Sequence, residues 1–267
     1  MPAPDLALLE EAVREAGQIA RRHFGSDYKK WDKSKGNPVT EADLEVDRFL
    51  RDKLRAARPA YGWLSEETED DPARLKAQTV FVVDPIDGTI GFIKGKPHFT
   101  ICAGTVQDGE PVAGAVYNPI TEECFTAYKG GGARLNGAPI HVSDRDEIAG
   151  CRMLGDRQMF AHAAWNTPPN RPWPPMEIES RSSIAYRAVL VAAGRFDAML
   201  ALSSKRDWDL AAAQIVVTEA GGLITTHAGA AMRYNRESTL HPSVVAAGPK
   251  LHARLMERVS HIRLPRG

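Results

Sequence analysis

Cysteine is scarce in this sequence. Three cysteines occur in 267 residues, and they are Cys102, Cys124 and Cys151. Their number is odd and their spacing matches no metal-binding pattern, which argues against a disulfide framework and against a thiolate metal site. Each cysteine is expected to be a small buried apolar residue. The protein is therefore predicted to work in the reducing cytoplasm.

Long apolar runs and an excess of one charge are also absent. No segment reaches the length of about 20 apolar residues that spans a membrane, and Met1 to Leu9 does not resemble a signal peptide. The 34 Lys and Arg balance 34 Asp and Glu, which argues against a surface that coats nucleic acid. We therefore expect a soluble globular protein whose partners include neither a membrane nor a nucleic-acid polymer.

What the sequence does contain is an apolar run that leads directly into two carboxylates. Thr79 to Val83 is β-branched and aromatic, which predicts a buried strand, and Pro85 is expected to end it. Asp84 and Asp87 would then converge around a tight turn, where two unpaired carboxylates repel each other. A bound Mg²⁺ removes this repulsion, because its preferred ligands are carboxylate, carbonyl and water oxygens. The alternative is ordinary turn chemistry, since Asp-Pro and Asp-Gly are common in loops.

Three further acidic residues lie where predicted elements begin or end. Asp43 follows Thr40 at the start of a predicted helix, and Asp209 lies in the opening of another. Capping of a helix N-terminus is the ordinary role of such residues. Glu66 follows a short apolar run, as Asp84 does. Each of these residues, taken alone, indicates only local structure.

Periodicity and turn residues predict the other elements. Helices are predicted over residues 6–25, 41–54, 184–193, 205–220 and 250–259, and Ser182 is expected to cap the third of them. Strands are predicted over residues 61–64, 79–83, 99–106, 111–117, 123–128, 196–202, 223–226 and 243–247. We predict two closely packed domains, an α+β domain with an antiparallel sheet over residues 1–143 and an α/β domain over residues 144–267.

The remaining segments are predicted to be loops. Residues 28–38 form a basic loop that either is solvated surface or brings Lys33 or Lys35 to an anionic substrate. Residues 91–97 are a second basic loop. Gly130 to Gly132 precedes no helix and lacks the spacing of a phosphate-binding loop, so it is expected to be a structural turn.

Four motifs in order resemble the inositol monophosphatase superfamily of metal-dependent phosphomonoesterases. They are Pro38-Val39-Thr40-Glu41-Ala42-Asp43, Glu66-Glu67, Asp84-Pro85-Ile86-Asp87-Gly88-Thr89, and Trp208-Asp209-Leu210-Ala211-Ala212 with Glu219-Ala220-Gly221-Gly222. The resemblance covers most of the chain. It implies a layered αβαβα sandwich, a homodimer, two or three Mg²⁺ ions per active site and inhibition by lithium.

The resemblance also implies a set of metal ligands. The first metal would be bound by Glu66, Asp84 and the carbonyl of Ile86. The second would be bound by Asp84, Asp87 and Asp209. Glu66 would share a further, weaker metal through water.

The catalytic residues implied by the resemblance are Asp43, Glu66 and Thr89. Asp43 and Thr89 would position the attacking water, which fits general-base chemistry. The phosphate would be held by the metals, by Asp87 and by the N–H groups of Gly88 and Thr89. Ser and Cys nucleophile motifs are absent, which fits direct attack by water.

The substrate is harder to predict. Inositol-specific members carry a glutamate seven residues before the aspartate of the Trp-Asp motif, and the residue here is Leu202, which cannot accept hydrogen bonds from inositol hydroxyls. The segment Gly91 to Lys96 is similar to the bacterial 3'(2'),5'-bisphosphate nucleotidase branch. In that case Lys94 or Lys96 would meet a second phosphate, although a solvated loop lysine is the ordinary interpretation. Lys33 of the first basic loop is a further candidate contact to the substrate phosphate.

These features favour 3'-phosphoadenosine 5'-phosphate as the substrate. Inositol monophosphate and histidinol phosphate are the alternatives. The adenine would stack on Trp165, Trp173 or Tyr186. A regulatory protein without turnover is the alternative of another class, but it would be expected to lack a metal ligand, and none of the predicted ligands is replaced.

Overall fold

The computed structural model of the chain describes residues 2–34 and 37–264. Its longer helices are α1 (Pro2–His23), α2 (Glu41–Ala57), α5 (Ile184–Ala192), α6 (Asp207–Glu219) and α7 (Pro249–Val259). The short helices are α3 (Thr89–Ile93), α4 (Arg157–Ala161) and two 3-10 helices, η1 (Pro72–Lys76) and η2 (Ala163–Asn166). Lys35 lies outside the described residues, so the structure says nothing of its predicted role.

The first sheet has seven strands in the order β3-β4-β5-β6-β7-β8-β9. In chain order they are β3 (Gly62–Ser65), β4 (Thr79–Asp87), β5 (Thr100–Gln107), β6 (Glu110–Asn118), β7 (Glu123–Tyr128), β8 (Ala133–Leu135) and β9 (Ala138–Pro139). Neighbours are antiparallel except β3 and β4, which run parallel. The prediction of an antiparallel sheet was therefore wrong at this edge. Residues 66–78, which include η1, provide the crossover that a parallel pair needs.

The second sheet has five strands in the order β11-β10-β12-β16-β14. They are β10 (Arg152–Leu154), β11 (Glu177–Glu179), β12 (Ala198–Ala201), β14 (Leu223–Thr225) and β16 (Val244–Ala247). Two separate hairpins complete the structure. One pairs β1 (Lys30–Ser34) with β2 (Asn37–Thr40), and the other pairs β13 (Lys205–Arg206) with β15 (Leu240–His241).

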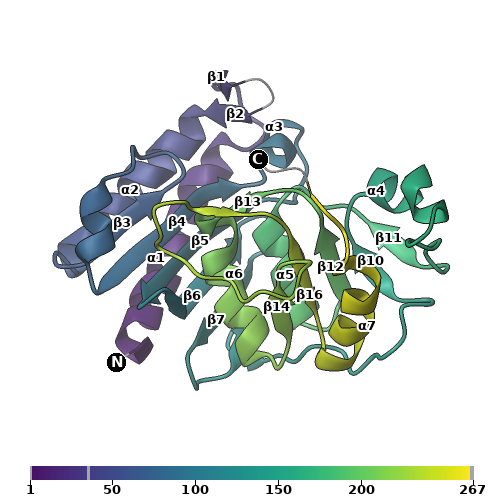
Figure 1. Ribbon diagram of the computed structural model, residues 1–267. Coiled ribbons are helices and arrows are strands. Elements are labelled where there is room, and N and C mark those ends of the chain that lie inside the picture. The colour runs from purple at the N-terminus through teal and green to yellow at the C-terminus, as the bar shows by residue number, and fades with distance from the viewer. Residues whose placement is uncertain (1, 35–36, 265–267) are drawn as a thin grey trace.

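Helices and sheets alternate in five layers (Figure 1). α1 and α2 cover one face of the first sheet, and α5 and α6 lie between the two sheets. α7 covers the far face of the second sheet, next to β16. This arrangement confirms the predicted αβαβα sandwich.

The apolar residues pack into three cores that follow these layers. The central core contains Val82 of β4 and Val244 of β16 around α5 and α6, so both predicted halves of the chain contribute to it. The domain boundary between residues 143 and 144 stays a prediction. None of the described helices is long and apolar enough to cross a membrane.

Several segments differ from their predicted structure. Residues 28–38 contain β1 and the start of β2 rather than loop alone, and residues 91–97 begin inside the short helix α3. The cap of α5 is Ser183, whose Oγ accepts a hydrogen bond from the N–H of Tyr186, and not Ser182. The glycine turn is structural as expected, because the N–H groups of Gly130 and Gly132 donate to the carboxylate of Glu219.

Candidate metal centre

A bulge at the end of β4 decides which way its carboxylates face. Val82 packs into the core between the sheets, and Val83 packs into the core beneath α1 and α2. Regular alternation would therefore place Asp84 on the inner face and Asp87, three residues later, on the outer face. The pairing with β5 shifts between these two residues, so that three steps along β4 oppose two along β5. The extra residue brings both carboxylates to the inner face.

The same bulge explains why Pro85 does not end the strand. The sequence predicted that β4 would stop there, but it continues to Asp87. A bulge leaves one residue without a ladder partner, so a proline can occupy it without the loss of a hydrogen bond. The prediction was wrong because a single strand does not show where its partner shifts register.

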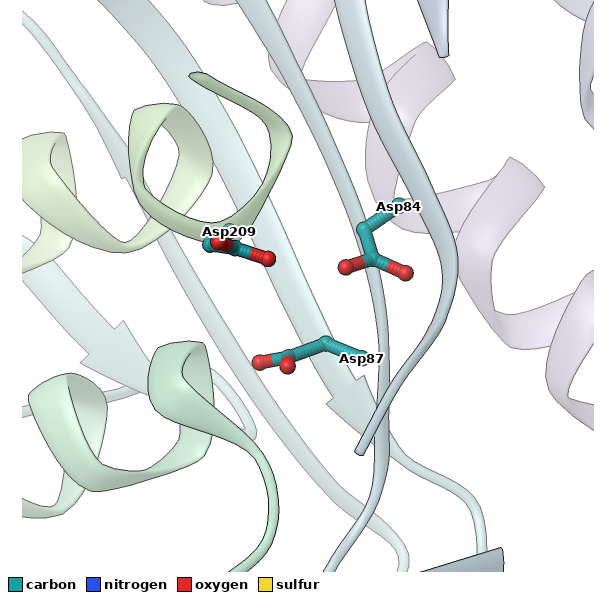
Figure 2. A group of neighbouring side chains, drawn as sticks. All are labelled: Asp84, Asp87 and Asp209. Carbon is teal, nitrogen blue, oxygen red and sulfur yellow. The ribbon is translucent and has the colours of Figure 1, made fainter. Parts of the chain in front are cut away.

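The third carboxylate comes from helix α6. Figure 2 shows Asp209 pointing toward Asp84 and Asp87 across the space between the helix and the strand. One carboxylate oxygen from each of the three residues lies within 4.8 Å of the others. Asp209 Oδ2 also accepts a hydrogen bond of 2.7 Å from the N–H of Arg206, as in a capping box. The Asp209 side chain can therefore cap α6 and face the other two carboxylates at the same time.

Asp84 is the unusual member of this cluster. Its side chain is buried, and neither of its carboxylate oxygens has a hydrogen-bond partner in the described part of the chain. Asp87 differs, because its Oδ2 accepts hydrogen bonds of 2.6 Å from Ser183 Oγ and from the N–H of Ala185. A buried charge without a partner is costly. A divalent cation between these oxygens would supply the partner, and carboxylate oxygens are the ligands that Mg²⁺ prefers.

Burial, together with neighbouring negative charges, raises the pKa of all three carboxyl groups. Burial, with the charges of Glu66, Asp87 and Asp209, raises the pKa of Asp84 well above its ordinary value. Burial and Asp87 raise the pKa of Asp209 to about 7. Burial also raises the pKa of Asp87 to about 6, although its hydrogen bonds oppose the shift. Repulsion of this kind is relieved when a cation binds.

Glu66 lines the same pocket as the three aspartates and forms an ion pair with Lys33. Lys33 Nζ lies 2.9 Å from Glu66 Oε1 and 2.8 Å from Glu67 Oε1. The β1-β2 hairpin therefore reaches the site through its lysine. Glu66 lines the same pocket as Asp84, while the predicted contact of Lys33 with a phosphate stays a prediction.

Asp43 and Thr89 meet beside Ile86. Asp43 Oδ2 accepts hydrogen bonds from the N–H and the hydroxyl of Thr40, which caps α2. Its other oxygen lies 3.3 Å from Thr89 Oγ1, and this hydroxyl also lies 3.1 Å from the carbonyl oxygen of Ile86. Burial raises the pKa of Asp43 to about 6. The side chain therefore serves as a helix cap and faces the predicted water-positioning threonine.

The carboxylates open into a pocket of about 400 Å³. The predicted residues that line it are Glu66, Asp84, Asp87, Gly88, Thr89 and Asp209. A larger hollow of about 800 Å³ runs along α2, but none of these six residues lines it. The chemistry of the lining, rather than its volume, identifies the smaller pocket as the candidate site.

Two predictions about substrate contacts are not supported by the geometry. Lys94 is exposed and lines a neighbouring hollow beside Trp31, rather than the carboxylate pocket. Trp165 and Tyr186 are buried, and Trp173 packs beneath the guanidinium of Arg258. These three rings are not available to stack on adenine.

The sequence reasoning missed three polar residues around the site. Ser183 orients Asp87, while Arg187 and Lys205 line a pocket next to the metal cluster. The serine pair at positions 182 and 183 signalled a helix cap but not a carboxylate partner. Arg187 had no signal, because a single arginine in an apolar helix does not show which layer it faces.

The comparison with known proteins agrees with this geometry. The sequence profile described as the inositol monophosphatase family matches residues 1–264. The chain belongs to this family. Its members are phosphoric monoester hydrolases, and so is this chain.

Similar family members cover nearly the whole chain. An inositol-1-monophosphatase from Rhizobium meliloti is 34% identical over 245 residues, which are 84% of this chain and 86% of that protein. A Nus factor SuhB from Xylella fastidiosa is 30% identical over 236 residues, or 86% of this chain and 84% of the other. The crystal structure of the extragenic suppressor protein suhB from Bartonella henselae has a TM-score of 0.84 and 26% identity, and the match covers 97% and 99% of the two chains.

Proposed function

We propose that this protein hydrolyses a small-molecule phosphate monoester by direct attack of water, with Mg²⁺ as the cofactor and 3'-phosphoadenosine 5'-phosphate as the favoured substrate. The observation that carries the proposal is the buried carboxylate of Asp84. It has no hydrogen-bond donor in the described chain, it lies within 4.8 Å of ligand oxygens of Asp87 and Asp209, and it lines an open pocket. Such an oxygen-only donor set fits Mg²⁺.

The metal ligands in this proposal are Asp84, Asp87, Asp209, Glu66 and the carbonyl of Ile86. Mg²⁺ bound there neutralises phosphoryl oxygens, lowers the pKa of water and stabilises the leaving alkoxide. Ser183 and the N–H of Ala185 hold one oxygen of Asp87, so its other oxygen is left to face the cluster. Hydrogen bonds of this kind, from residues that do not themselves bind the metal, fix the orientation of a metal ligand such as Asp87.

Thr89 and Asp43 are proposed to orient the attacking water and to accept its proton. The hydroxyl of Thr89 lies within reach of both Asp43 Oδ1 and the Ile86 carbonyl. A base is most useful when its pKa lies near the working pH. The raised pKa of Asp43, about 6, brings this carboxylate closer to that range.

Gly88 is proposed to place backbone N–H groups against the phosphate. It has a positive φ of 95° before the first residue of α3. A Cβ atom there would lie 2.8 Å from the backbone nitrogen of Ser183 and 2.9 Å from the His98 carbonyl oxygen. Only glycine fits both the conformation and the space.

The choice of leaving group rests on the residues beside the cluster. Leu202 lines the adjoining pocket with Leu200 and Ala201, and at this position it offers no hydrogen-bond acceptor to inositol hydroxyls. Inositol 1-phosphate is the first alternative, since the Rhizobium relative carries that activity in its name. Histidinol phosphate is the second. A regulatory role is a candidate of another class, because the Xylella relative is called a Nus factor.

The metal assignment is tested by Asp84→Asn, with Asp108→Asn as the matched control. Asp108 is exposed and lies in the β5-β6 turn, at the other end of β5 from the site. Asp84→Asn should abolish Mg²⁺-dependent phosphate release and keep its circular dichroism spectrum, whereas Asp108→Asn should behave as wild type. Full activity of Asp84→Asn would overturn the assignment.

The substrate is tested by phosphate release from 3'-phosphoadenosine 5'-phosphate, inositol 1-phosphate and histidinol phosphate, each with and without Mg²⁺. We expect the highest kcat/KM for the nucleotide. A preference for inositol 1-phosphate would show that the leucine position does not set specificity. Absence of turnover with every compound would favour the regulatory role.

We also propose that the protein is a cytoplasmic homodimer, as the family resemblance and the reduced cysteines suggest. The three cysteines are buried and unpaired in the structure. Sedimentation equilibrium of the purified protein would give the oligomeric state, and a monomer at micromolar concentration would contradict it.

A further inference from the structure

A second pocket adjoins the metal pocket. It has a volume of about 380 Å³, and its floor contains Leu200, Ala201 and Leu202. Ser182 and Arg187 line both pockets, so the two are continuous. A substrate whose phosphate lies at the carboxylates would extend into this second pocket.

Arg187 projects from α5 into the junction of the two pockets. Its Nε donates a hydrogen bond of 2.6 Å to the carbonyl oxygen of Arg181, and one terminal nitrogen donates to the same oxygen. The side chain is largely buried, and burial lowers its pKa. Among the residues that the structure describes, no carboxylate forms an ion pair with it.

Lys205 lines the same pocket and belongs to β13, directly before α6. Its Nζ is bound only to neutral acceptors, namely Ser203 Oγ at 2.8 Å and the Ser204 and Ser203 carbonyl oxygens at 2.9 and 3.3 Å. It too forms no ion pair within residues 2–34 and 37–264. Burial lowers its pKa, although the charge of Asp209 opposes this shift.

No nearby acidic residue forms an ion pair with these two cations in the part of the chain that the structure describes. Asp156 lines the pocket and caps α4, where its Oδ1 accepts a hydrogen bond from the N–H of Gln158, and its charge acts on Arg187 only through space. Asp87 and Asp209 act on Lys205 through space, and in the proposed function they are ligands of Mg²⁺. If a metal ion balances the charges of Asp87 and Asp209, the two positive charges of Arg187 and Lys205 exceed the single negative charge of Asp156 in this pocket.

We propose that Arg187 and Lys205 form a subsite for a second anionic group of the substrate, and that this group is a phosphate. The inference rests on the proposed phosphatase function and makes it more specific. Arginine and lysine are the side chains that bind phosphate through charge-assisted hydrogen bonds. The apolar floor between them suits the carbon skeleton that joins the two phosphates. The substrate is thus a bisphosphate that loses one phosphate at the carboxylates and keeps the other at the cations.

The test compares substrates that differ only in the second phosphate. One pair is 3'-phosphoadenosine 5'-phosphate with adenosine 3'-phosphate, and the other is inositol 1,4-bisphosphate with inositol 1-phosphate. Each is assayed with wild type, Arg187→Met, Lys205→Met and the control Lys250→Met, which removes an exposed lysine at the start of α7. Arg187→Lys keeps the charge if Arg187→Met fails to fold.

The expected result is a higher kcat/KM for the bisphosphate than for the monophosphate, and this difference should depend on both Arg187 and Lys205. In at least one pair, the second phosphate should raise the wild-type kcat/KM by about tenfold or more, the order expected for charge-assisted hydrogen bonds. Lys205→Met and Arg187→Met should remove most of this gain, so each should lower kcat/KM for the bisphosphate by a much larger factor than for the matching monophosphate. Lys250→Met should keep it, and Arg187→Lys should keep part of it.

Two outcomes overturn the inference. Wild type may favour neither bisphosphate, or the gain may survive in both neutral variants. Either result leaves the phosphatase function standing, because the monophosphates are still hydrolysed. Failure of the proposed function itself would look different, since no substrate would then be turned over by wild type.

Discussion

At the scale of single residues, several side chains combine a structural role with a role in the site. Asp43 caps α2 through one oxygen and faces Thr89 with the other. Asp209 likewise belongs to a capping box and to the metal cluster. Local sequence patterns predicted the capping of both residues. The resemblance, rather than the pattern, predicted their convergence, because convergence depends on strands and helices distant in the chain.

Thr89 provides the first prediction at this scale. Thr89→Ala should lower kcat by about a hundredfold or more, because the hydroxyl between Asp43 and the Ile86 carbonyl is lost. Thr89→Ser keeps the hydroxyl and should keep most of the activity. Steady-state kinetics with saturating Mg²⁺ would measure both variants. Equal rates for the two would show that the hydroxyl has no part in the reaction.

Ser183 provides the second. Its hydroxyl donates to Asp87 Oδ2 and accepts from the N–H of Tyr186 at the start of α5. Ser183→Ala should therefore weaken Mg²⁺ binding and lower the free energy of unfolding by about 1–2 kcal/mol. Ser182→Ala is the neighbouring control, since Ser182 does not cap the helix. Isothermal titration with Mg²⁺ and urea denaturation would separate the two effects, and identical binding by both variants would contradict the orienting role.

At the scale of elements, the bulge of β4 and the seating of α6 create the site. Propensity predicted the strand, and apolar residues predicted the helix. The bulge was missed because it is a property of a strand pair, and the single apolar stretch gave no sign of it. The hairpin β1-β2 was missed because its composition is basic and polar, whereas strand prediction relies on apolar and β-branched residues.

The seating of α6 depends on small residues in the sheet below it. A Cβ atom at Gly114 would lie 2.5 Å from the carbonyl oxygen of Ala212 in α6, while one at Gly104 would lie 3.3 Å from the nearest helix atoms. Gly114→Ala should cost about 1–3 kcal/mol of unfolding free energy through overpacking. It should also lower activity, because the displaced helix carries Asp209.

Gly104→Ala is the matched control for this helix contact. It adds the same methyl group on the neighbouring strand, facing the same helix, with more room. Thermal denaturation and kcat/KM would be compared in both variants. A larger loss in Gly104→Ala than in Gly114→Ala would show that the approach of α6 is not set by this contact.

At the scale of the whole molecule, the candidate metal site lies where the first sheet meets the helix layer between the two sheets. Asp84 and Asp87 belong to a strand of the first sheet, and Asp209 belongs to the helix between the sheets. The layered architecture could be predicted, because the motif order resembles a known family. The carboxylate pocket and the pocket that adjoins it could not be predicted, because their linings combine residues from separate segments of the chain. Arg187 and Lys205, for example, come from different elements and line the same pocket.

The raised pKa values make the stability of the metal-free protein depend on pH. The carboxyls of Asp84, Asp87 and Asp209 have an ordinary pKa of 3.8 but raised values in the folded state, about 6 and about 7 for the last two. The folded protein therefore holds protons that the unfolded chain releases. The stabilisation is complete below about pH 4 and is lost as the pH rises through about 7.

The expected result is a higher Tm at pH 5.5 than at pH 8 for protein treated with a chelator. Mg²⁺ binds the deprotonated carboxylates, so its stabilising effect should grow with pH and should reduce or reverse the difference. Differential scanning calorimetry with and without Mg²⁺ would measure this. Asp84→Asn should show a smaller dependence on pH. A metal-free protein whose Tm rises steadily from pH 5.5 to 8 would contradict the repulsion described for the cluster.

The ion pair of Lys33 with Glu66 and Glu67 has one more consequence. Burial opposes the charge of Lys33, yet the two carboxylates outweigh it and raise its pKa. The β1-β2 hairpin thus places a cation beside Glu66, and a metal ion that binds Glu66 would have to displace the Lys33 ammonium group. Binding of Mg²⁺ at Glu66 would therefore replace the charge of Lys33 with that of the metal ion. Lys33→Met should shift a Mg²⁺ titration to lower concentration, and the hairpin should be released as the metal enters.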